Sequence, residues 1–596
     1  MCGISGIFNF SKKKIDNKET IKKILNIQDQ RGPDNKELWE SECKKITFGH
    51  NRLSIIDLSK NSNQPFISED ENYIITFNGE IYNFKELKKE LIKKNFFFKT
   101  NSDTEVILQS YRCWGLNFVK YLRGMFAFAI YDKTKKNIIL ARDPFGIKPL
   151  YYVKKNGVLY FASLIKSLLS IKDISFTTSK AGICSYYLWG HIQEPFTLYN
   201  EIKSLEKGTI KIINTEGIES NLTYASIKET MLNSNYEKFD NELDAMNFVK
   251  DELDQSLNYH QISDVPITLL LSSGIDSNIL LASISKDNKK NLDALTLDFD
   301  FKGNKNESKI AAKSASNNNI NHKIKRYKDT EIKNLLENFF IQMDSPTSDG
   351  FNNFLISNEV NKNDKKIMIS GVGADELFLG YPSFKRIPII YNLFKFLPSI
   401  NLNQGNIVFK MFNRLNINSK YLGLLKYHNS YEKIFFLQRC SFLPEELKFL
   451  VDEHTLNEGL EELNIFDDLK QDVKDFDNNE LLTMYLEIKY YLCSRLLRDG
   501  DWSSMSNSVE MRTPYVDWFF FKNILKVINS DIKINKETLL NIYNKNIPVE
   551  LYKRKKTGFE IPHSKYYNLA SNKKGHFSKS IKNWTKLSMD NYMKNN

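Results

Sequence analysis

Long apolar runs are absent from this chain of 596 residues, although 41% of its residues are hydrophobic. No uncharged apolar stretch reaches the ~18 residues that a membrane-spanning helix requires. The N-terminus also lacks a basic stretch followed by a long apolar segment, which is the pattern of a secretory signal. We therefore expect a cytoplasmic protein with no membrane span.

Cysteine is also scarce, because the chain has six cysteines and none of them belongs to a CxxC pair. This spacing indicates neither a disulfide framework nor a zinc site. Cys2 stands out because loss of the initiator methionine would make it the N-terminal residue. Its thiol would then lie beside an α-amino group with a reference pKa of ~7.7 to 8.0, which can act as the base for its own nucleophile.

The formal net charge of +12 comes from lysines that are interleaved with acidic residues along the chain. The only dense basic run is the Lys-Arg-Lys-Lys sequence at 553–556. This distribution favours a solvated surface over a nucleic-acid-binding surface, so we expect no nucleic-acid partner.

The length predicts two large domains, because a single hydrophobic core stops growing at roughly 250 to 300 residues. Over the first 170 residues, β-branched and aromatic runs broken by turn residues predict strands in stacked layers, with two or so helices. A mixed connecting region follows at about 180–230, and alternating strand and helix patterns then predict a parallel sheet covered by helices. Beyond about residue 385 the pattern is mostly helical. The predicted fold class is α/β, with domains at 1–210 and 211–596.

Five short motifs follow one another in the N-terminal part: MCGISGIF, HNRLSIID (50–57), FNGEIYN (77–83), SDTE (102–105) and ARDPFGIKPLYY (141–152). In this order they resemble the class II glutamine amidotransferase domain. The resemblance implies the αββα sandwich of the N-terminal nucleophile hydrolases. It also implies that Cys2 attacks the side-chain amide of glutamine and releases ammonia.

The same resemblance assigns the other parts of a glutaminase site. Arg52 would bind the α-carboxylate of glutamine through its planar fork of donors, and Asp103 would bind the α-ammonium group. Asn78 and the backbone N–H of Gly79 would form the oxyanion hole. The implied glutamine-binding residues are Arg52, Leu53, Ser54, Ile55, Ile56, Asn78, Gly79, Glu80 and Asp103.

A second site is indicated by LLLSSGIDSN, where an apolar strand (265–271) ends in hydroxyl and glycine residues. We expect a helix to start at about Asp276 or Ser277, and N–H groups at a helix start form an anion site together with hydroxyl donors. The chain has no GxxxxGK(S/T) sequence, so this is not a P-loop. The motif resembles the pyrophosphate loop of enzymes that adenylate a carboxylate, while a serine-rich helix cap is the simpler alternative.

The sequence SGVGADELFLGY (370–381) places Asp375 after a glycine-rich turn. Asp375 and Asp276 are candidate ligands of Mg²⁺, which takes one or two carboxylates together with phosphate oxygens. A helix N-terminus would favour acidic residues at 375 and 376 without any metal, so that alternative stays open.

Two further motifs, LLRDGDWSSMSNSVEMRTPYVD (496–517) and RKKTGFEIP (554–562), extend the resemblance to nearly the whole chain. The chain is similar to the glutamine-hydrolysing asparagine synthetases. This implies an adenylating second domain, ATP, glutamine and a carboxylate acceptor as substrates, Mg²⁺ as cofactor, and a homodimer. Lys556 would stabilise the charge that develops at the α-phosphorus. The implied ATP-binding residues are Leu271, Ser272, Ser273, Gly274, Asp276, Ser277, Leu297, Ser370 and Gly371.

Three residues depart from the family pattern. Leu164 stands where the family often has Glu, and Ser273 replaces the first glycine of the pyrophosphate loop. Val372 stands where asparagine synthetases commonly have the Glu that assists the aspartyl-adenylate step, and valine can neither bind a cation nor move a proton. The family resemblance still implies aspartate as the acceptor. Because of Val372, a uronic acid sugar of a surface polysaccharide is the alternative acceptor.

Three other classes of protein remain to be weighed against this interpretation. A cyclising synthetase of the β-lactam type has lost the N-terminal cysteine, whereas Cys2 is present here. A tRNA-modifying enzyme with a pyrophosphate loop would not be expected to carry a complete glutaminase half. An inactive binding protein would not hydrolyse glutamine after removal of Met1.

Overall fold

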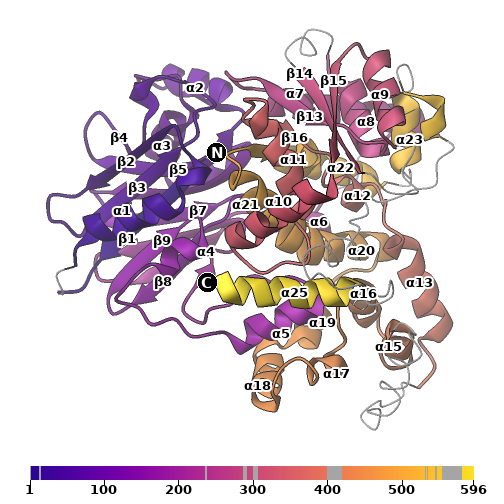
Figure 1. Cartoon of the computed structure of the whole chain (residues 1–596). Coiled ribbons are helices and arrows are strands. Elements are labelled where there is room, and N and C mark those ends of the chain that lie inside the picture. Colours follow the sequence, from indigo (N-terminus) through magenta and orange to yellow (C-terminus); the bar gives the residue numbers. More distant parts are fainter. Residues whose placement is uncertain are drawn as a thin grey trace.

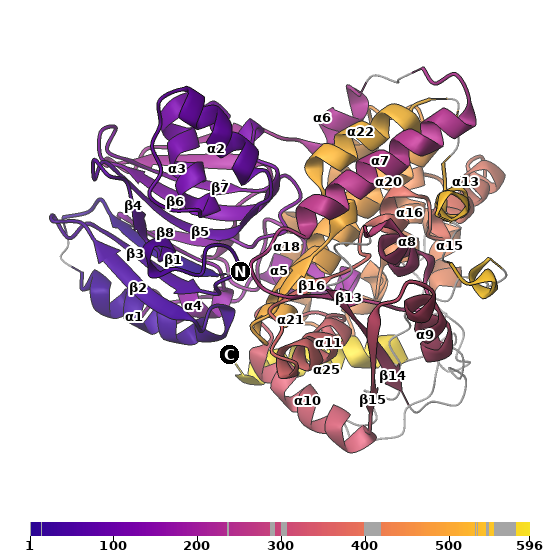
Figure 2. The same cartoon turned by 90° about the horizontal axis from the view of Figure 1, so that it is seen from above.

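The computed structural model in Figure 1 describes residues 2–12, 15–234, 238–285, 292–299, 307–398, 419–530, 532, 534–543, 547–552 and 580–595. Among these residues, no helix combines the length and the apolar character needed to cross a membrane. The N-terminal half lies beside the C-terminal half, and Figure 2 shows the two as adjoining bodies.

The N-terminal domain is built on two antiparallel sheets of six strands each. Their strand orders are β10-β8-β9-β1-β3-β2 and β12-β11-β7-β6-β5-β4. Side chains of both sheets, such as Phe8, Phe48, Leu140 and Phe161, form a shared apolar core, so the sheets stack face to face. The strands are β1 (Gly3–Asn9), β2 (Asn35–Glu40), β3 (Ile46–Arg52), β4 (Phe66–Ile67), β5 (Tyr73–Ile81), β6 (Gly124–Asp132), β7 (Asn137–Arg142), β8 (Tyr151–Lys155), β9 (Val158–Ala162), β10 (Lys203–Ser204), β11 (Thr209–Asn214) and β12 (Glu219–Thr223).

Helices cover the outer faces of both sheets. Ile21 and Ile24 of α1 and Ile165 of α4 share an apolar cluster with Ile7 of β1. On the other side α3 contacts β5 and α2 packs against α3. The predicted αββα sandwich is confirmed. It has four helices, whereas the sequence pattern predicted about two. These helices are α1 (Asn17–Ile27), α2 (Phe84–Lys93), α3 (Asp103–Trp114) and α4 (Ile165–Leu169).

The connecting region contains one helix and three strands. Helix α5 (Lys180–Trp189) contacts α18 (Glu453–Leu463) of the second domain, as Figure 1 shows at the lower edge. Strands β10, β11 and β12 then return to the two N-terminal sheets. The predicted division at 210/211 falls inside β11, which pairs with β7 on one side and β12 on the other. We therefore propose a domain boundary after Thr223.

The second domain contains the predicted parallel sheet, in the order β15-β14-β13-β16-β17. Its strands are β13 (Ile267–Leu270), β14 (Leu292–Phe299), β15 (Asn321–Tyr327), β16 (Ile367–Ile369) and β17 (Glu510–Arg512). Strand β13 is shorter than the expected 265–271, and helix α8 begins at Ile275, one residue before the expected start. Because parallel strands end at the same edge, the loops after β13 and β16 are neighbours.

Helices make up most of the rest of this domain, and β17 is the only strand in the described residues beyond 385. The helices around the sheet are α6 (Ile227–Leu232), α7 (Glu242–His260), α8 (Ile275–Ser283), α9 (Glu307–Asn317), α10 (Asp329–Gln342), α11 (Phe351–Lys362) and α12 (Ala374–Leu377). The later helices include α13 (Ser383–Phe394), α15 (Lys420–Tyr427), α16 (Tyr431–Arg439), α17 (Pro444–Leu447), α19 (Ile465–Val473), α20 (Asn479–Glu487), α21 (Arg498–Met505), α22 (Trp518–Ile528), α23 (Lys536–Ile542) and α25 (Ser580–Asn595).

Candidate active sites

Cys2 lies at the buried start of β1, the strand between β3 and β9. Its backbone nitrogen donates a hydrogen bond to Asn78 Oδ1 at 3.1 Å, which links β1 to β5 of the facing sheet. Burial raises the pKa of the Cys2 thiol above its usual range. The N-terminal amine, a backbone hydrogen bond from Leu53 and the charge of Arg52 act in the opposite direction. The thiol therefore needs a nearby base to become a nucleophile, and removal of Met1 would make the nitrogen of Cys2 an α-amine that can serve as that base.

The two predicted oxyanion donors adjoin each other on β5. Asn78 uses its side-chain oxygen to accept from Cys2, while its Nδ2 is buried without a hydrogen-bond partner. Gly79 has φ +154°, and a Cβ there would lie 2.1 Å from the carbonyl oxygen of Met125. Glycine is therefore required at 79 for β5 to pass β6. An unpaired buried N–H next to the nucleophile is a suitable donor for a developing oxyanion.

Arg52 ends β3, the strand that pairs with β1, and its side chain is buried. Its guanidinium donates to the carbonyl oxygen of Ser59 at 2.8 Å and to Asn63 Oδ1 at 2.7 Å, and also to the carbonyl of Asp57. These acceptors are neutral, and in the described part of the chain no carboxylate forms an ion pair with Arg52. The guanidinium is thus held in place with its charge available for an anion.

Two buried carboxyls lie at the other end of this site. Asp103 at the start of α3 accepts from the backbone N–H of Ile81 at 3.0 Å. Burial raises the pKa of Asp103 to about 6. Burial, and then the charge of Glu510, raises the pKa of Glu80 well above its usual range. A substrate ammonium group would relieve the cost of ionising either carboxyl in the buried site.

The structure therefore gathers most of the predicted glutamine-binding residues around Cys2. Ser54, Ile55 and Ile56 continue the chain beyond Leu53, and the last two are buried. The backbone N–H of Ser54 donates to Asp34 Oδ2 at 2.6 Å, which fixes the loop. Among the described residues, no hydrogen bond or ion pair joins these three side chains to Cys2, so their part in glutamine binding stays a prediction.

The glutamine site borders directly on the second domain. The buried Arg31 donates through Nε to the carbonyl oxygen of Cys2 at 3.1 Å and through Nη1 to Asp501 Oδ2 at 2.8 Å. Asp501 also lies 3.5 Å from Nζ of the buried Lys148. Glu80 lies 3.5 Å from Nη2 of Arg512, the last residue of β17. Charged groups thus connect the two domains at the nucleophile itself.

The predicted pyrophosphate loop lies between β13 and α8. The hydroxyl oxygens of Ser272 and Ser277 are 3.0 Å apart, and the N–H of Gly274 donates to Ser272 Oγ at 3.0 Å. Ser273, which replaces the usual glycine, is not among the described residues with positive φ. The loop therefore does not require glycine at that position for backbone conformation.

The second loop follows β16 and approaches the first closely. The N–H of Ser370 donates to the carbonyl oxygen of Arg512 at 2.9 Å, which holds the loop on the sheet edge. A Cβ on Gly371 would lie 3.1 Å from the Cβ of Asp276, so a larger residue would press on the start of α8. Both loops line one cavity of about 930 Å³. All nine predicted ATP-binding residues and Asp375 line this cavity.

The two predicted metal ligands converge on one cation. Nζ of Lys536 at the start of α23 lies 2.5 Å from Asp276 Oδ1 and also forms an ion pair with Asp375. The carboxylates of Asp276 and Asp375 are therefore close enough to share a positive ion. This arrangement fits Mg²⁺, whose usual protein ligands are one or two carboxylates.

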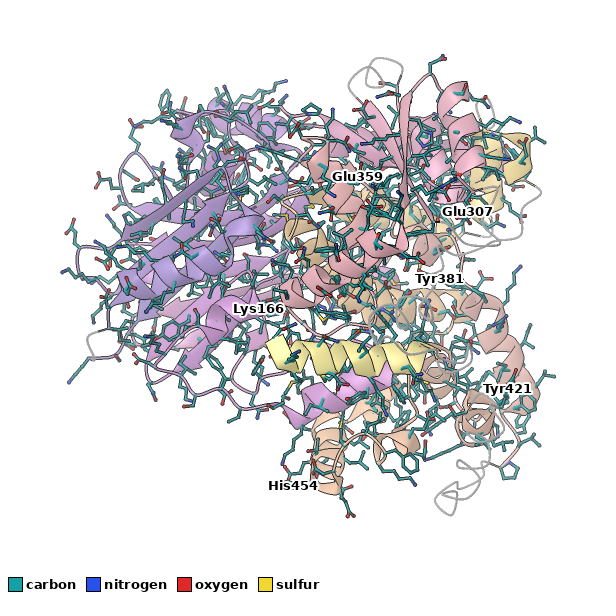
Figure 3. All side chains as sticks on the ribbon, in the orientation of Figure 1. Lys166, Glu307, Glu359, Tyr381, Tyr421 and His454 are labelled. Atoms are coloured by element: carbon teal, nitrogen blue, oxygen red, sulfur yellow. The ribbon has the colours of Figure 1, made fainter. Side chains whose placement is uncertain are left out.

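Lys536 and Glu376 are cavity residues that the sequence analysis did not single out. Lys536 lies 161 residues beyond Asp375 in the sequence, and no local motif marks it. Glu376 is buried, accepts from Tyr381 Oη at 2.9 Å, and burial raises its pKa to about 7. The available signal for Glu376 in the sequence is its position next to Asp375. Two acidic residues at that place also fit the N-terminal cap of a helix. Figure 3 labels Tyr381 and Glu307, which line the same cavity.

The structure also shows the surroundings of Val372 and Leu164, the other two residues that depart from the family pattern. Val372 lines the cavity beside Gly371 and Gly373. Leu164 precedes α4, and the first N–H groups of that helix donate to Asp344 of the second domain at 3.1 and 3.0 Å. Asp344 thus supplies a carboxylate at the start of α4, next to the position where the family often has Glu. Lys556 lies outside the described residues, so its predicted role has no structural account here.

Comparisons with known proteins agree in both halves. The family model described as "Glutamine amidotransferase domain" matches residues 1–225, and the one described as "Asparagine synthase" matches residues 249–592. The chain is 30% identical, over 100% of its length and 89% of the relative, to glutamine-hydrolyzing asparagine synthetase 1 of Bacillus subtilis (strain 168). It is 28% identical to asparagine synthetase 3 of the same organism, over 64% of each chain.

Among solved structures, the glutamine phosphoribosylpyrophosphate amidotransferase of B. subtilis aligns with a TM-score of 0.30 and 18% identity, over 45% of this chain and 60% of that one. This alignment is too weak to carry an argument. The family matches and the full-length relative instead decide the assignment. The chain belongs to the asparagine synthase family, the ATP-dependent ligases that make amides with glutamine as the nitrogen donor.

Proposed function

We propose that this protein makes asparagine from aspartate, with ammonia that it releases from glutamine at Cys2. The observation that carries the proposal is that every residue assigned to ATP lines a single cavity, while the glutamine residues gather around Cys2. Arg31 contacts both the carbonyl of Cys2 and Asp501 of the second domain, so the nucleophile is held directly against the domain that contains the cavity.

In the glutaminase half, the α-amine of Cys2 takes the thiol proton and the sulfur attacks the amide carbon of glutamine. Asn78 Nδ2 and the N–H of Gly79 donate to the oxyanion, each worth on the order of 3 kcal/mol in the transition state. Arg52 binds the α-carboxylate and Asp103 the α-ammonium, which orients the amide. Collapse of the intermediate expels ammonia, and water then cleaves the thioester to glutamate.

In the synthetase half, the acceptor carboxylate attacks the α-phosphorus of ATP and pyrophosphate leaves. The hydroxyls of Ser272 and Ser277 and the N–H groups at the start of α8 bind the phosphate oxygens. Asp276 and Asp375 would hold Mg²⁺, which supplies charge neutralisation on the phosphates. Ammonia then attacks the acyl-adenylate to give the amide and AMP, and enclosure protects the adenylate from water. Lys556 would stabilise the charge at the α-phosphorus.

Val372 gives a specific reason to keep a second acceptor. This cavity residue replaces the Glu that commonly assists aspartyl-adenylate formation, so a uronic acid sugar of a surface polysaccharide is the alternative acceptor. Glu376 is a buried carboxyl of the same cavity, and we propose that it takes over the role of the missing Glu. A cytoplasmic location and a homodimer complete the proposal.

The deciding experiment measures pyrophosphate release from ATP and Mg²⁺ with ammonia, comparing aspartate with a panel of uronic acids. Release with aspartate, and asparagine identified by mass spectrometry, would establish the first acceptor. Turnover of a uronic acid without turnover of aspartate would replace it with the second.

A further inference from the structure

A stripe of apolar side chains projects into solvent from α13 and the residues just after it. Ile389 is 57% exposed, Leu393 68% and Phe396 88%. Their spacing places them on one face of the helix. The opposite face, with Phe384 and Ile387, is buried. Helix α13 is thus docked by one apolar face, while its other apolar face is uncovered by the described residues.

Helix α15 extends this surface. Tyr421 is 69% exposed and Leu425 44% exposed. The two segments adjoin, because His428 Nε2 lies 3.0 Å from the carbonyl oxygen of Leu397, which is itself 54% exposed. Figure 1 places α13 and α15 at the corner farthest from the N-terminal domain, and Figure 3 labels Tyr421 there. The α13–α15 face consists of Ile389, Leu393, Phe396, Leu397, Tyr421 and Leu425.

The sequence around this face contains no negative charge. No Asp or Glu occurs between Glu376 and Glu432, whereas about one residue in eight of the whole chain is acidic. The cations in the same interval are Lys385, Arg386, Lys395, Lys410, Arg414, Lys420 and Lys426. An apolar surface on a basic stretch of sequence without acidic residues is complementary to an anionic lipid surface.

The cations of α13 are available for such a surface, whereas those of α15 are engaged elsewhere. Lys426 forms an ion pair with Glu445, and Lys420 donates to the carbonyl of Gln438 at 2.8 Å. Lys385 and Arg386 are exposed, and no carboxylate in the described part of the chain pairs with them or with Lys395. The three cations flank the apolar stripe at both of its ends.

The α13–α15 face adjoins the synthetase cavity. Tyr381, Pro382 and Lys385 line that cavity, and α13 begins at Ser383. The helix that carries the exposed stripe therefore starts at the cavity rim. A lipid surface bound along α13 would therefore lie close to the rim of the cavity.

We propose that the α13–α15 face binds the surface of an anionic phospholipid membrane. Phe396, Leu393 and Ile389 enter the interfacial layer, and Arg386 and Lys395 pair with lipid phosphates. This is peripheral binding, consistent with the absence of a membrane-spanning helix among the described residues. The charge pattern favours lipid over a second copy of this chain, because two identical basic faces would repel each other.

The test is co-sedimentation of the full chain with vesicles of phosphatidylglycerol mixed with phosphatidylcholine, and with vesicles of phosphatidylcholine alone. The full chain should bind the anionic vesicles and release from them at high salt, because screening weakens contacts between exposed charges. Binding to neutral vesicles should be far weaker.

Two double variants separate the apolar and the electrostatic contributions. Leu393→Ser with Phe396→Ser should weaken binding at least about tenfold, because both side chains lose apolar area that would otherwise leave water. Arg386→Gln with Lys395→Gln should weaken it about 30-fold, from roughly fivefold per cation. The matched control is Ile92→Ser with Phe97→Ser, which are 52% and 80% exposed in the N-terminal domain. The control variant should bind like the unaltered chain.

The outcomes decide the proposal. Failure of the full chain to bind either kind of vesicle overturns the proposal. The face would then be covered by residues 399–418 or by a second copy of this chain. Sedimentation equilibrium would detect the second copy. Equal loss in the control variant would also overturn it. The changed side chains are exposed, except that of Lys395, which is partly exposed. The midpoint of urea unfolding of each variant reports whether the second domain, which carries α13, has folded.

Discussion

Nζ of Lys536 lies 2.5 Å from Asp276 Oδ1 and pairs with Asp375 as well, so one ammonium is shared by both proposed ligands of Mg²⁺. Gly380 allows this contact, because a Cβ there would lie 2.7 Å from Cε of Lys536. Metal and ammonium therefore compete for the same carboxylates when no nucleotide is bound.

Replacement of Lys536 by Met should strengthen metal binding in the absence of nucleotide by about tenfold, because the two carboxylates lose their counter-ion. Titration with Mn²⁺, followed by electron paramagnetic resonance, measures this directly. Lys385→Met is the control, since Lys385 lines the same cavity without an ion pair to either carboxylate. Unchanged Mn²⁺ affinity in the Lys536 variant would argue against a shared site.

Cys2→Ala should abolish glutamine-dependent amide synthesis while free ammonia still supports it. The reason is that only the nucleophile of the first domain is removed, and the ATP cavity is unchanged. Glutamate release and AMP formation measure the two activities separately. Loss of both activities in a folded variant would contradict the two-site arrangement.

Lys556→Ala should have the reverse effect, because its proposed role is confined to the adenylation step. Amide formation should stop with either nitrogen source, while glutamine hydrolysis continues. Pyrophosphate release is the measurement for the first activity. An unimpaired synthetase would show that Lys556 lies outside the active site.

The pH dependence of glutamine binding should follow Asp103. The pKa of Asp103 is about 6, which lies above the usual 3.8. Below that pH the carboxyl is mostly neutral and cannot pair with the α-ammonium group of glutamine. The KM for glutamine should therefore rise as the pH falls below about 6, by up to about tenfold per pH unit. Initial glutaminase rates between mildly acidic and neutral pH measure it.

Asp103→Asn provides the control for this pH dependence. The variant should have a high KM that no longer changes with pH over the same interval. A flat KM for the unaltered protein would remove Asp103 from the ammonium site.

Asp501→Ala should destabilise the contact between the domains. It leaves Arg31 and Lys148 buried without their shared carboxylate, which typically costs about 3 to 5 kcal/mol. The midpoint of urea unfolding is the measurement. Lys366→Gln, at a partly exposed pair with Asp34 across the same contact, should change stability by less than about 1 kcal/mol. Equal effects of the two variants would argue against a structural role for the buried pair.

The residue pattern predicted strands and helices in stacked layers, and the alternation of strand and helix patterns after about residue 240 predicted the parallel sheet. The αββα sandwich was implied by the resemblance of the five N-terminal motifs to the glutamine amidotransferase domain. The short motifs around Ser272 and Ser370 predicted residues that line one cavity, because the residues of each motif lie within a single loop. Their roles in binding ATP stay predictions. The division at 210/211 stays a prediction, and it falls inside β11, whose pairing with β7 is a contact that no local pattern encodes.

Which distant residues meet depends on how the elements pack against one another. Lys536 reaches Asp276 because α23 packs against α8, and Arg31 reaches Asp501 because the two domains adjoin at the nucleophile. The exposed stripe on α13 was equally unreadable from sequence, since an apolar helix face looks the same whether it is covered or not. In each case the deciding quantity is a distance across the fold, which chain order does not fix.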